Sequence, residues 1–458
     1  MNDWASDAVF YHLYPLGCLG AEERNQFDGS RVDRLSRLQE WIGYLADLGV
    51  NAVCLGPVFE SSAHGYDTAD YYRVDRRLGD NDSLAVLSRS LHDRGIRLVL
   101  DGVFHHTGRD FWAFRNLQEK GESSVHRDWY HLDFTRRSSM GDPFYYEGWA
   151  GHYDLVKLNV RNEAVRDYLL KAVSAWIEWF QIDGLRIDAA DSLDLDFQRE
   201  LAAHCRSLRP DFWLMGEVVH GDYRHWAYPD GLSSITNYEV YKGLWSSHND
   251  RNYYEIAYSL NRQFGPDGIY RGLDLYTFAD NHDVDRVAST LKDAGHLYPL
   301  YVLLLTMPGV PSLYYGSECG IEGRKAAGTD APLRPALDPV EIFRKGAHPD
   351  LHQVVKQLIA LRHQYVALRR GDYAQLHVAH EQFGFLRRLA SSPDEAGSVV
   401  VVVNAANRGA EVALSLPFNT GRLIDRLNRD EVFQVVNGRC VLPLHSHWAR
   451  VLIIEEVG

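Results

Sequence analysis

Strand-like and helix-like segments alternate along most of this chain, and this alternation limits the possible fold more than any other feature. Apolar residues at helical spacing separate the strand-like segments, and the clearest stripe runs from Val165 to Phe180, with Asn162 as its expected N-cap. Strands that alternate with helices pair in parallel, and eight such units predict a closed (β/α)8 barrel, an α/β fold. The expected strands cover residues 8–15, 51–59, 96–104, 184–190, 211–217, 233–238, 275–280 and 311–316.

The alternation breaks in two places. Residues 105–161 are rich in charged residues, glycine and aromatics and have no clear period, which indicates an insertion after the third strand. Beyond residue 370, short strands separated by turn residues indicate an antiparallel C-terminal β-sandwich domain over 371–458. The barrel is therefore expected over residues 1–104 and 162–370.

The composition is that of a globular protein, with 45% hydrophobic and 24% charged residues. The formal net charge of -14 argues against nucleic acid and against an anionic membrane surface as partners, and leaves a neutral ligand open. The most apolar run, residues 297–306, is too short to span a bilayer and is expected to form a buried helix.

Targeting and metal signals are missing from the sequence pattern. The first residues contain no basic segment followed by an apolar core, so we expect a cytoplasmic protein without a signal peptide. The five cysteines are scattered and form no CxxC pair, which predicts reduced thiols and no zinc site. We expect no cofactor and no metal, and the pattern leaves the oligomeric state open.

Charged side chains follow four of the expected strands at the points where these strands end. The active sites of (β/α)8 enzymes lie at this carboxyl-terminal rim. In the stretch GLRIDAADS, Arg186 and Asp188 point the same way because they are two residues apart on a strand. The strand-end residues are Asp101 with His105 and His106, Arg186 with Asp188, Glu217, and the run Asp280, Asn281, His282 and Asp283.

Converging carboxylates are typical of glycoside hydrolysis, metal clusters and aspartyl dyads. Arg186 is expected to keep Asp188 ionised. Glu217 follows the apolar run FWLMG and has no cation next to it in sequence, so burial is expected to raise its pKa, as a general acid requires. A barrel glycosidase is the first hypothesis, and a metal-dependent barrel hydrolase is the second.

Four motifs together resemble the signature regions of the α-amylase family of glycoside hydrolases: DGVFHH (101–106), GLRIDAAD (184–191), LMGEVV (214–219) and FADNHD (278–283). HGYDTADYY, LVKLN and GEVVH are most similar to the cyclomaltodextrinase, neopullulanase and maltogenic amylase branch. That branch usually has an additional N-terminal β domain, whereas the first expected barrel strand here begins within about ten residues of Met1.

The resemblance implies a role for each residue that matches a motif. Asp188 falls on the nucleophile that forms a covalent glycosyl-enzyme, Glu217 on the general acid/base, and Asp283 on a third carboxylate that holds sugar hydroxyls. The other matched positions are Arg186, which positions the nucleophile, His106 and His282, which bind hydroxyls, Tyr66, which stacks on the sugar, and Asp101, a structural carboxylate.

Several positions depart from the family pattern or allow two interpretations. His105 stands where many amylases have a calcium-binding Asn, and Asp191-Ser192 stands where long-chain amylases often have Lys-His. Asp191 could contact substrate or cap a helix. Arg334 could clamp a sugar hydroxyl or form a structural loop salt bridge, and Trp149 and Trp226 could be sugar platforms or core residues.

The resulting hypothesis is a retaining hydrolase of α-1,4-linked gluco-oligosaccharides, with a small-molecule oligosaccharide as its partner. The first alternative is a transglycosylase or isomerase of the same family, such as a trehalose-forming enzyme. A remote alternative is a catalytically silent carbohydrate-binding subunit, which the presence of all three carboxylates argues against.

Overall fold

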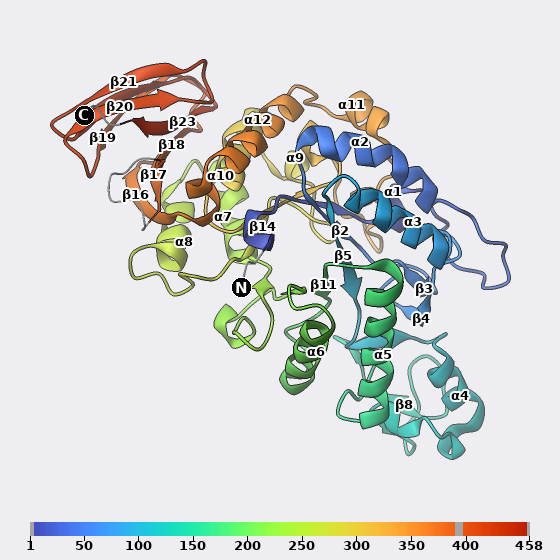
Figure 1. Cartoon of the computed structure of the whole chain (residues 1–458). Helices are drawn as coiled ribbons and strands as arrows, with labels where there is room; N and C mark the ends of the chain where they lie inside the picture. The colour runs from blue at the N-terminus through green and yellow to red at the C-terminus, as the bar shows by residue number, and fades with distance from the viewer. Residues whose placement is uncertain (1–3, 390–396, 456–458) are drawn as a thin grey trace.

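The computed structural model describes residues 4–389 and 397–455, and a barrel of parallel strands lies at its centre (Figure 1). Within these residues the barrel sheet has eight strands in the order β13-β12-β11-β5-β2-β1-β15-β14, and a bridge between Thr236 and Tyr276 closes it. The strands are β1 (Phe10–Leu13), β2 (Ala52–Leu55), β5 (Arg97–Gly102), β11 (Gly184–Ile187), β12 (Trp213–Gly216), β13 (Ser234–Ile235), β14 (Tyr276–Phe278) and β15 (Val310–Tyr314). The predicted (β/α)8 barrel is confirmed.

Side chains alternate between the barrel interior and the surrounding helices, as the two-residue period of a strand requires. Phe10, Val99 and Met215 belong to one core cluster, whereas Leu185 and Ile187 belong to the larger cluster formed with the helices. The main helices are α2 (Gln39–Leu48), α3 (Asn81–His92), α5 (Glu163–Phe180), α6 (Leu195–Leu208), α7 (Tyr238–Asn249), α8 (Tyr254–Phe264), α10 (Leu297–Thr306) and α12 (Leu351–Gln364).

The helix ends follow local signals in the sequence. Asn162 caps α5 by accepting a hydrogen bond from the Ala164 amide at 2.9 Å, as predicted. Helix α2 ends at Gly49, whose φ of 91° lies in the left-handed region that glycine adopts without steric cost. Helix α10 is the buried helix expected for the most apolar run. Among the described residues, no helix is long and apolar enough to cross a membrane.

One expected strand is divided in the structure. The single strand expected over 51–59 is the barrel strand β2 followed by a separate short strand, β3 (Phe59–Ser61), which pairs with β4 (Thr68–Val74). The Gly-Pro pair at 56–57 separates them, because proline has no amide hydrogen for a sheet ladder. The last two helices before the C-terminal strands, α12 and α13 (Val366–Arg370), are separated by Tyr365.

The segment after β5 forms a small sheet beside the barrel, as an insertion at this place would (Figure 1). Its strands have the order β6-β10-β9, and the antiparallel pair of β6 and β10 brings His106 opposite Lys157. This sheet therefore continues directly from the rim of the barrel. The limits 105–161 stay a prediction. The elements are β6 (His106–Gly108), α4 (Trp112–Lys120), β7 (Leu132–Asp133), β8 (Tyr145–Tyr146), β9 (Gly148–Trp149) and β10 (His152–Lys157).

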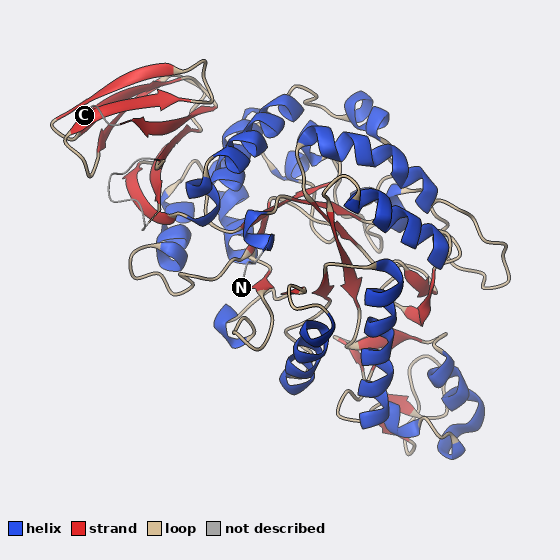
Figure 2. Cartoon of the chain, viewed as in Figure 1, coloured by secondary structure: helices blue, strands red, loops and turns tan. Residues whose placement is uncertain are grey.

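The C-terminal strands form an antiparallel sheet at one end of the molecule (Figure 2). Among the described residues, hydrogen bonds join eight strands in the order β16-β17-β18-β23-β20-β21-β22-β19, and the edge strands β16 and β19 lie close together. The sheet thus folds over its own core, which contains Val402, Leu414 and Leu442. The strands are β16 (Asp372–Val378), β17 (Gln382–Arg388), β18 (Val399–Asn404), β19 (Ala410–Ser415), β20 (Thr420–Asp425), β21 (Glu431–Val436), β22 (Arg439–Leu444) and β23 (Trp448–Glu455).

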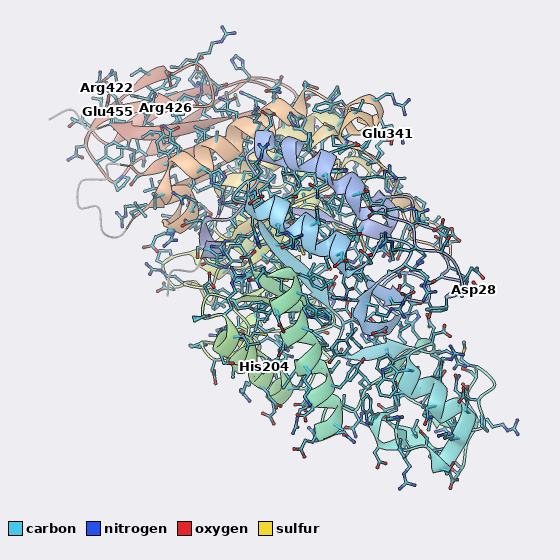
Figure 3. The ribbon with its side chains drawn as sticks, turned by 45° about the vertical axis from the view of Figure 1, so that its right-hand side comes forward. Asp28, His204, Glu341, Arg422, Arg426 and Glu455 are labelled. Carbon is cyan, nitrogen blue, oxygen red and sulfur yellow. The ribbon has the colours of Figure 1, made fainter. Side chains whose placement is uncertain are left out.

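The two faces of this sheet differ in what they contact. Val401 and Val451 belong to the same core cluster as the barrel helices, and β18 and β23 lie against α10. On another part of the domain, Arg422 and Glu455 form an exposed ion pair of 2.7 Å (Figure 3). Exposed pairs of this kind contribute little to stability. The C-terminal domain therefore packs on the barrel through the apolar side chains of β18 and β23, and hydrogen bonds such as that from Arg387 to the Thr306 carbonyl also join the two.

Candidate active site

Backbone pairing at the barrel rim brings the strand-end residues together. Asp101 and Arg186 are direct neighbours in the register of β5 and β11. The ladder continues beyond the strands, because the Asp188 amide donates to the Gly102 carbonyl at 3.0 Å and the Glu217 amide donates to the Ile187 carbonyl at 2.9 Å. These backbone bonds fix Asp101, Asp188 and Glu217 on three adjacent strands.

The Arg186 guanidinium is the centre of this cluster and is only 4% exposed. Its Nη1 donates to both Asp101 oxygens, at 2.7 and 2.6 Å. Its Nη2 lies 2.8 Å from Glu217 Oε2, and its Nη1 lies 3.6 Å from Asp188 Oδ1. One buried cation therefore contacts three carboxylates, so the cluster carries excess negative charge when all three are ionised.

The structure corrects the expected pairing of Arg186. Its closest contacts are with Asp101 and Glu217, so Glu217, which has no cation next to it in sequence, has one beside it in the folded chain. Burial, with the charge of Glu217 adding to it, raises the pKa of Asp188 well above its ordinary value, and Arg186 only partly opposes this. The direction of this shift runs against the expectation that Arg186 keeps Asp188 ionised.

Glu217 has two further contacts that the motifs did not indicate. Its Oε2 accepts from the Ala189 amide at 3.3 Å, and its Oε1 accepts from the Tyr238 hydroxyl at 3.4 Å. Ala189 has a φ of 47°, an unusual left-handed conformation for a residue with a side chain. This backbone turn, directly after Asp188, aims the amide at Glu217, and strain of this kind is typical of functional sites.

The pKa of Asp283 is shifted in the opposite direction to that of Asp188. Its carboxylate lies 3.0 Å from His282 Nε2 and accepts from Arg334 Nη2 at 2.9 Å. Burial alone would raise the pKa of Asp283, but His282 and Arg334 hold it below its ordinary value. Arg334 also contacts Asp330, and its guanidinium lies 4.4 Å from the centre of the Tyr14 ring. The loop ion pair expected for Arg334 is thus made with a site carboxylate.

Aromatic rings form one wall of the cluster. The His282 ring is stacked between Tyr14 and Tyr66, with ring centres 5.6 and 5.5 Å away. The Tyr66 hydroxyl donates to Asp101 at 2.9 Å and also contacts His282 Nε2. These contacts hold Tyr66 and His282 in fixed positions beside the carboxylates.

His106 faces the opposite side of Asp188. Its Nε2 lies 3.9 Å from Asp188 Oδ2 and has no hydrogen-bond partner, although the ring is buried. Burial, with smaller effects of neighbouring histidines, lowers the pKa of His106 to about 3, so the ring is neutral at pH 7. A neutral imidazole with a free nitrogen can bond a hydroxyl group of a ligand.

Comparisons with known proteins agree with this geometry. The family described as "Alpha amylase, catalytic domain" matches residues 25–338. The chain belongs to the α-amylase family. It is an α-amylase-family glycoside hydrolase, and its four motifs supply the clustered residues described above.

Similar proteins of this family cover nearly the whole chain. A "Cyclomaltodextrinase" from Geobacillus thermopakistaniensis (strain MAS1) is 30% identical, over 96% of this chain and 76% of the relative. "Neopullulanase 2" from Thermoactinomyces vulgaris is 31% identical, over 98% and 78%. An "Intracellular maltogenic amylase" from Bacillus subtilis is 27% identical, over 97% and 74%. A solved "Cyclomaltodextrinase" structure has a TM-score of 0.85 at 26% identity and covers 98% of this chain and 78% of that chain.

The structure also places the residues that allowed two interpretations, and it adds two that the sequence analysis did not name. The half-buried Trp149 lies 6.2 Å from the His106 ring and so borders the cluster, whereas Trp226 packs against the hydrophobic core. Asp191 is exposed. The residue that caps α6 is Asp194, so the helix-cap interpretation of Asp191 was wrong. Tyr14 and Tyr238 were missed, although both stand directly after expected barrel strands or at their ends.

His105, the position where family members often have a calcium-binding Asn, lies beside His106. The two Nδ1 atoms are 3.2 Å apart, and burial lowers the pKa of His105 to about 4. The only His, Cys, Asp and Glu group found close enough to hold a metal among the described residues does not include His105. All five cysteines are buried and free, as predicted.

Proposed function

We propose that this α-amylase-family chain is a retaining hydrolase that cleaves α-1,4-linked gluco-oligosaccharides by double displacement. The observation that carries the proposal is the contact of Asp188 and Glu217, from adjacent strand ends, with the same guanidinium of Arg186. Two carboxyl groups that meet at one cation can act on opposite sides of a single glycosidic bond. Asp188 is assigned as nucleophile and Glu217 as general acid/base.

The protons balance over the two steps of this mechanism. Burial and the Glu217 charge raise the pKa of Asp188, and Arg186 opposes this, so the cation favours the ionised form that a nucleophile needs. In the first step Glu217 gives its proton to the leaving oxygen while Asp188 forms the bond to the anomeric carbon. In the second step Glu217 takes a proton from water, whose oxygen replaces Asp188 with the same configuration as the substrate.

The remaining site residues would hold the sugar. Asp283 stays ionised beside His282 and Arg334, so it can accept hydrogen bonds from two sugar hydroxyls. The free Nε2 of His106 offers a third polar contact. Tyr66, fixed by Asp101 and His282, offers a flat face for stacking on the sugar ring.

The assay that tests the proposal is a product time course on maltotriose, a cyclodextrin, pullulan and trehalose. We expect hydrolysis of maltotriose and the cyclodextrin, with NMR of the fresh product showing the α anomer. A β product would mean inversion and would remove the nucleophile role of Asp188. Transfer products that dominate even at low substrate concentration, or maltose made from trehalose, would favour the transglycosylase or isomerase alternative.

Substrate length is a second part of the proposal. The exposed Asp191, where long-chain family members often have Lys, offers no cation to a leaving glucan chain. Remote contacts supply much of the rate on long substrates, so we expect kcat/KM to stop rising at about three or four glucose units. The measurement is a series from maltose to maltoheptaose with soluble starch alongside. A steady rise to the heptaose, with starch best, would contradict it.

We also assign the activity to the cytoplasm, which the name of the Bacillus subtilis relative, "Intracellular maltogenic amylase", supports. Fractionation of the source cells with a periplasmic and a cytoplasmic marker enzyme tests this assignment. Activity that follows the periplasmic marker would overturn it.

A further inference from the structure

Three metal-ligating side chains outside the active-site cluster meet where the barrel contacts the C-terminal domain. Asp293 and His296 flank the short turn of helix before α10, and His447 lies in the turn between β22 and β23. One ligand atom from each of the three side chains lies within 4.8 Å of the other two. Two segments that are distant in the sequence thus place two imidazoles and one carboxylate at one point.

His296 has the hydrogen-bond pattern of a metal ligand. Its Nε2 lies 3.0 Å from the Ala405 carbonyl, which can only accept, so Nε2 must carry the hydrogen. The other ring nitrogen, Nδ1, then has a bare lone pair. This atom is buried in a residue that is only 2% exposed, and it has no hydrogen-bond partner. Metal-bound histidines usually donate their second nitrogen to a carbonyl or carboxylate in this way.

Asp293 and His447 complete the arrangement. Asp293 Oδ1 accepts from the Gly295 amide at 2.9 Å, which orients the carboxylate and leaves Oδ2 to face His447. The His447 Nε2 atom is buried without a hydrogen-bond partner and lies 3.5 Å from Asp293 Oδ2. This separation is too long for a good hydrogen bond but agrees with the edge of a tetrahedral zinc site, about 3.4 Å for zinc-ligand bonds of about 2.0–2.2 Å.

The backbone is shaped to admit the His447 ring. A Cβ on Gly295 would lie 2.1 Å from His447 Nδ1, so any residue other than glycine would displace the ring. His447 itself has a φ of 48°, a strained left-handed conformation for a residue with a side chain. The strained backbone of His447 and the absence of a side chain on Gly295 together allow the His447 ring to lie beside Asp293 and His296.

We propose that Asp293, His296 and His447 bind a zinc ion that joins the barrel to the C-terminal domain. Two imidazole nitrogens and one carboxylate oxygen suit zinc, whereas calcium and magnesium prefer oxygen ligands. A water molecule would be the fourth ligand. The proposal runs against the expectation from the sequence that this chain has no metal, and it does not depend on the proposed function.

The groups packed around the site allow this assignment. His248, whose ring centre lies 5.3 Å from that of His296, has both nitrogens engaged, with the Leu244 carbonyl and the Tyr253 hydroxyl, so it is not a fourth ligand.

The test is zinc binding to the chelator-stripped full chain, measured by calorimetry with Zn²⁺ alone and by metal content after dialysis. We expect one tightly held zinc per chain. His447→Ala and Asp293→Asn should each weaken binding by about 100-fold or more. Asp293→Asn keeps the oxygen that accepts from Gly295, so it tests the metal without removing the turn. His445→Ala, which removes an exposed histidine two residues from His447, is the matched control and should bind like the unmodified chain.

Thermal unfolding gives the second readout. Zinc should raise the Tm of the unmodified chain and of His445→Ala, and should leave the Tm of Asp293→Asn unchanged. Activity of the stripped enzyme on maltotriose at a temperature well below the Tm should be the same with and without zinc, because the site does not touch the active-site cluster. Equal zinc affinity and equal Tm shifts in the unmodified chain and in Asp293→Asn would overturn the proposal and leave an ordinary Asp-His contact.

Discussion

Two buried aspartates stand at the two ends of the same short strand, and their settings are opposite. Asp183 precedes β11 and Asp188 follows it. Asp183 accepts from Arg97 at 2.6 Å, from Arg209 at 2.7 Å and from the Leu98 amide at 2.8 Å, and it also contacts His92. For Asp188, the nearest cationic nitrogen is Arg186 Nη1 at 3.6 Å, and the neutral His106 ring lies 3.9 Å away through its Nε2.

The pKa values follow from these contacts. Burial would raise the pKa of Asp183, but the hydrogen bonds from His92, Arg97 and the Leu98 amide lower it below its ordinary value. Burial and Glu217 raise the pKa of Asp188. A fully bonded carboxylate stabilises the fold, whereas a carboxylate that keeps unused bonding capacity is available to a substrate. One strand therefore has a structural end and a reactive end.

The largest expected effect is on kcat and comes from Asp188, at the reactive end of β11. Asp188→Ala should lower kcat on maltotriose on the order of 10⁴-fold, because no other group can form the covalent intermediate. Its Tm should equal or exceed that of the unmodified chain, since the raised pKa shows that the fold disfavours the Asp188 charge. Initial rates and thermal unfolding are the measurements. Near-normal turnover in this variant would contradict the assignment of Asp188 as the reactive end of the strand.

Asp183, at the structural end of β11, should affect stability much more than activity. Asp183→Asn leaves two half-buried arginines without this anion and should lower the free energy of unfolding by about 1–3 kcal/mol. Its kcat/KM, measured where the variant is folded, should stay within about 3-fold of the unmodified chain. Denaturant unfolding monitored by circular dichroism gives the stability. A stable but inactive Asp183→Asn would show that the two ends are not separate in function.

A pH series of Tm values sharpens the contrast. The lowered pKa of Asp183 means that its stabilisation is present above the unfolded pKa of about 3.9 and is lost as pH falls below it. The raised pKa of Asp188 means that its charge destabilises the fold at neutral pH, and that this cost disappears on acidification. Relative to the unmodified chain, Asp183→Asn should be less stable and Asp188→Ala no less stable at pH 7. The Tm difference between each variant and the unmodified chain should shrink towards pH 3. Tm differences that stay constant with pH would show that ionisation of Asp183 and Asp188 does not cause them.

The smallest effect is expected at Asp191, three residues beyond Asp188 and exposed. Asp191→Ala should change the free energy of unfolding by less than about 0.5 kcal/mol and kcat/KM on maltotriose by less than about 3-fold. The assays used for the other variants apply here too. A large loss of activity on maltotriose would place Asp191 in direct contact with short substrates.

The sequence was sufficient for the barrel because each strand and helix carries its own local signal, such as the apolar stripe of α5 and its cap Asn162. The motifs also identified Asp188, Glu217 and Asp283 as neighbours. They could not reveal that Arg186 turns towards Glu217, because the choice among three carboxylates depends on side-chain geometry. The meeting of His296 with His447 was likewise hidden, since it depends on how the C-terminal domain packs on the barrel.

The way in which the barrel closes has a consequence for how the enzyme should lose activity on heating. Strand β13 has two residues, and its side facing β14 is joined by the Thr236–Tyr276 bridge and by the hydrogen bond from the Asn237 amide to the Tyr276 carbonyl at 2.8 Å. Such a short seam is the natural place for the ring of strands to open locally. Tyr238, which contacts Glu217, stands directly after this seam. Amide hydrogens around 234–237 should therefore exchange with solvent early, and catalysis should fade while the rest of the barrel is still closed.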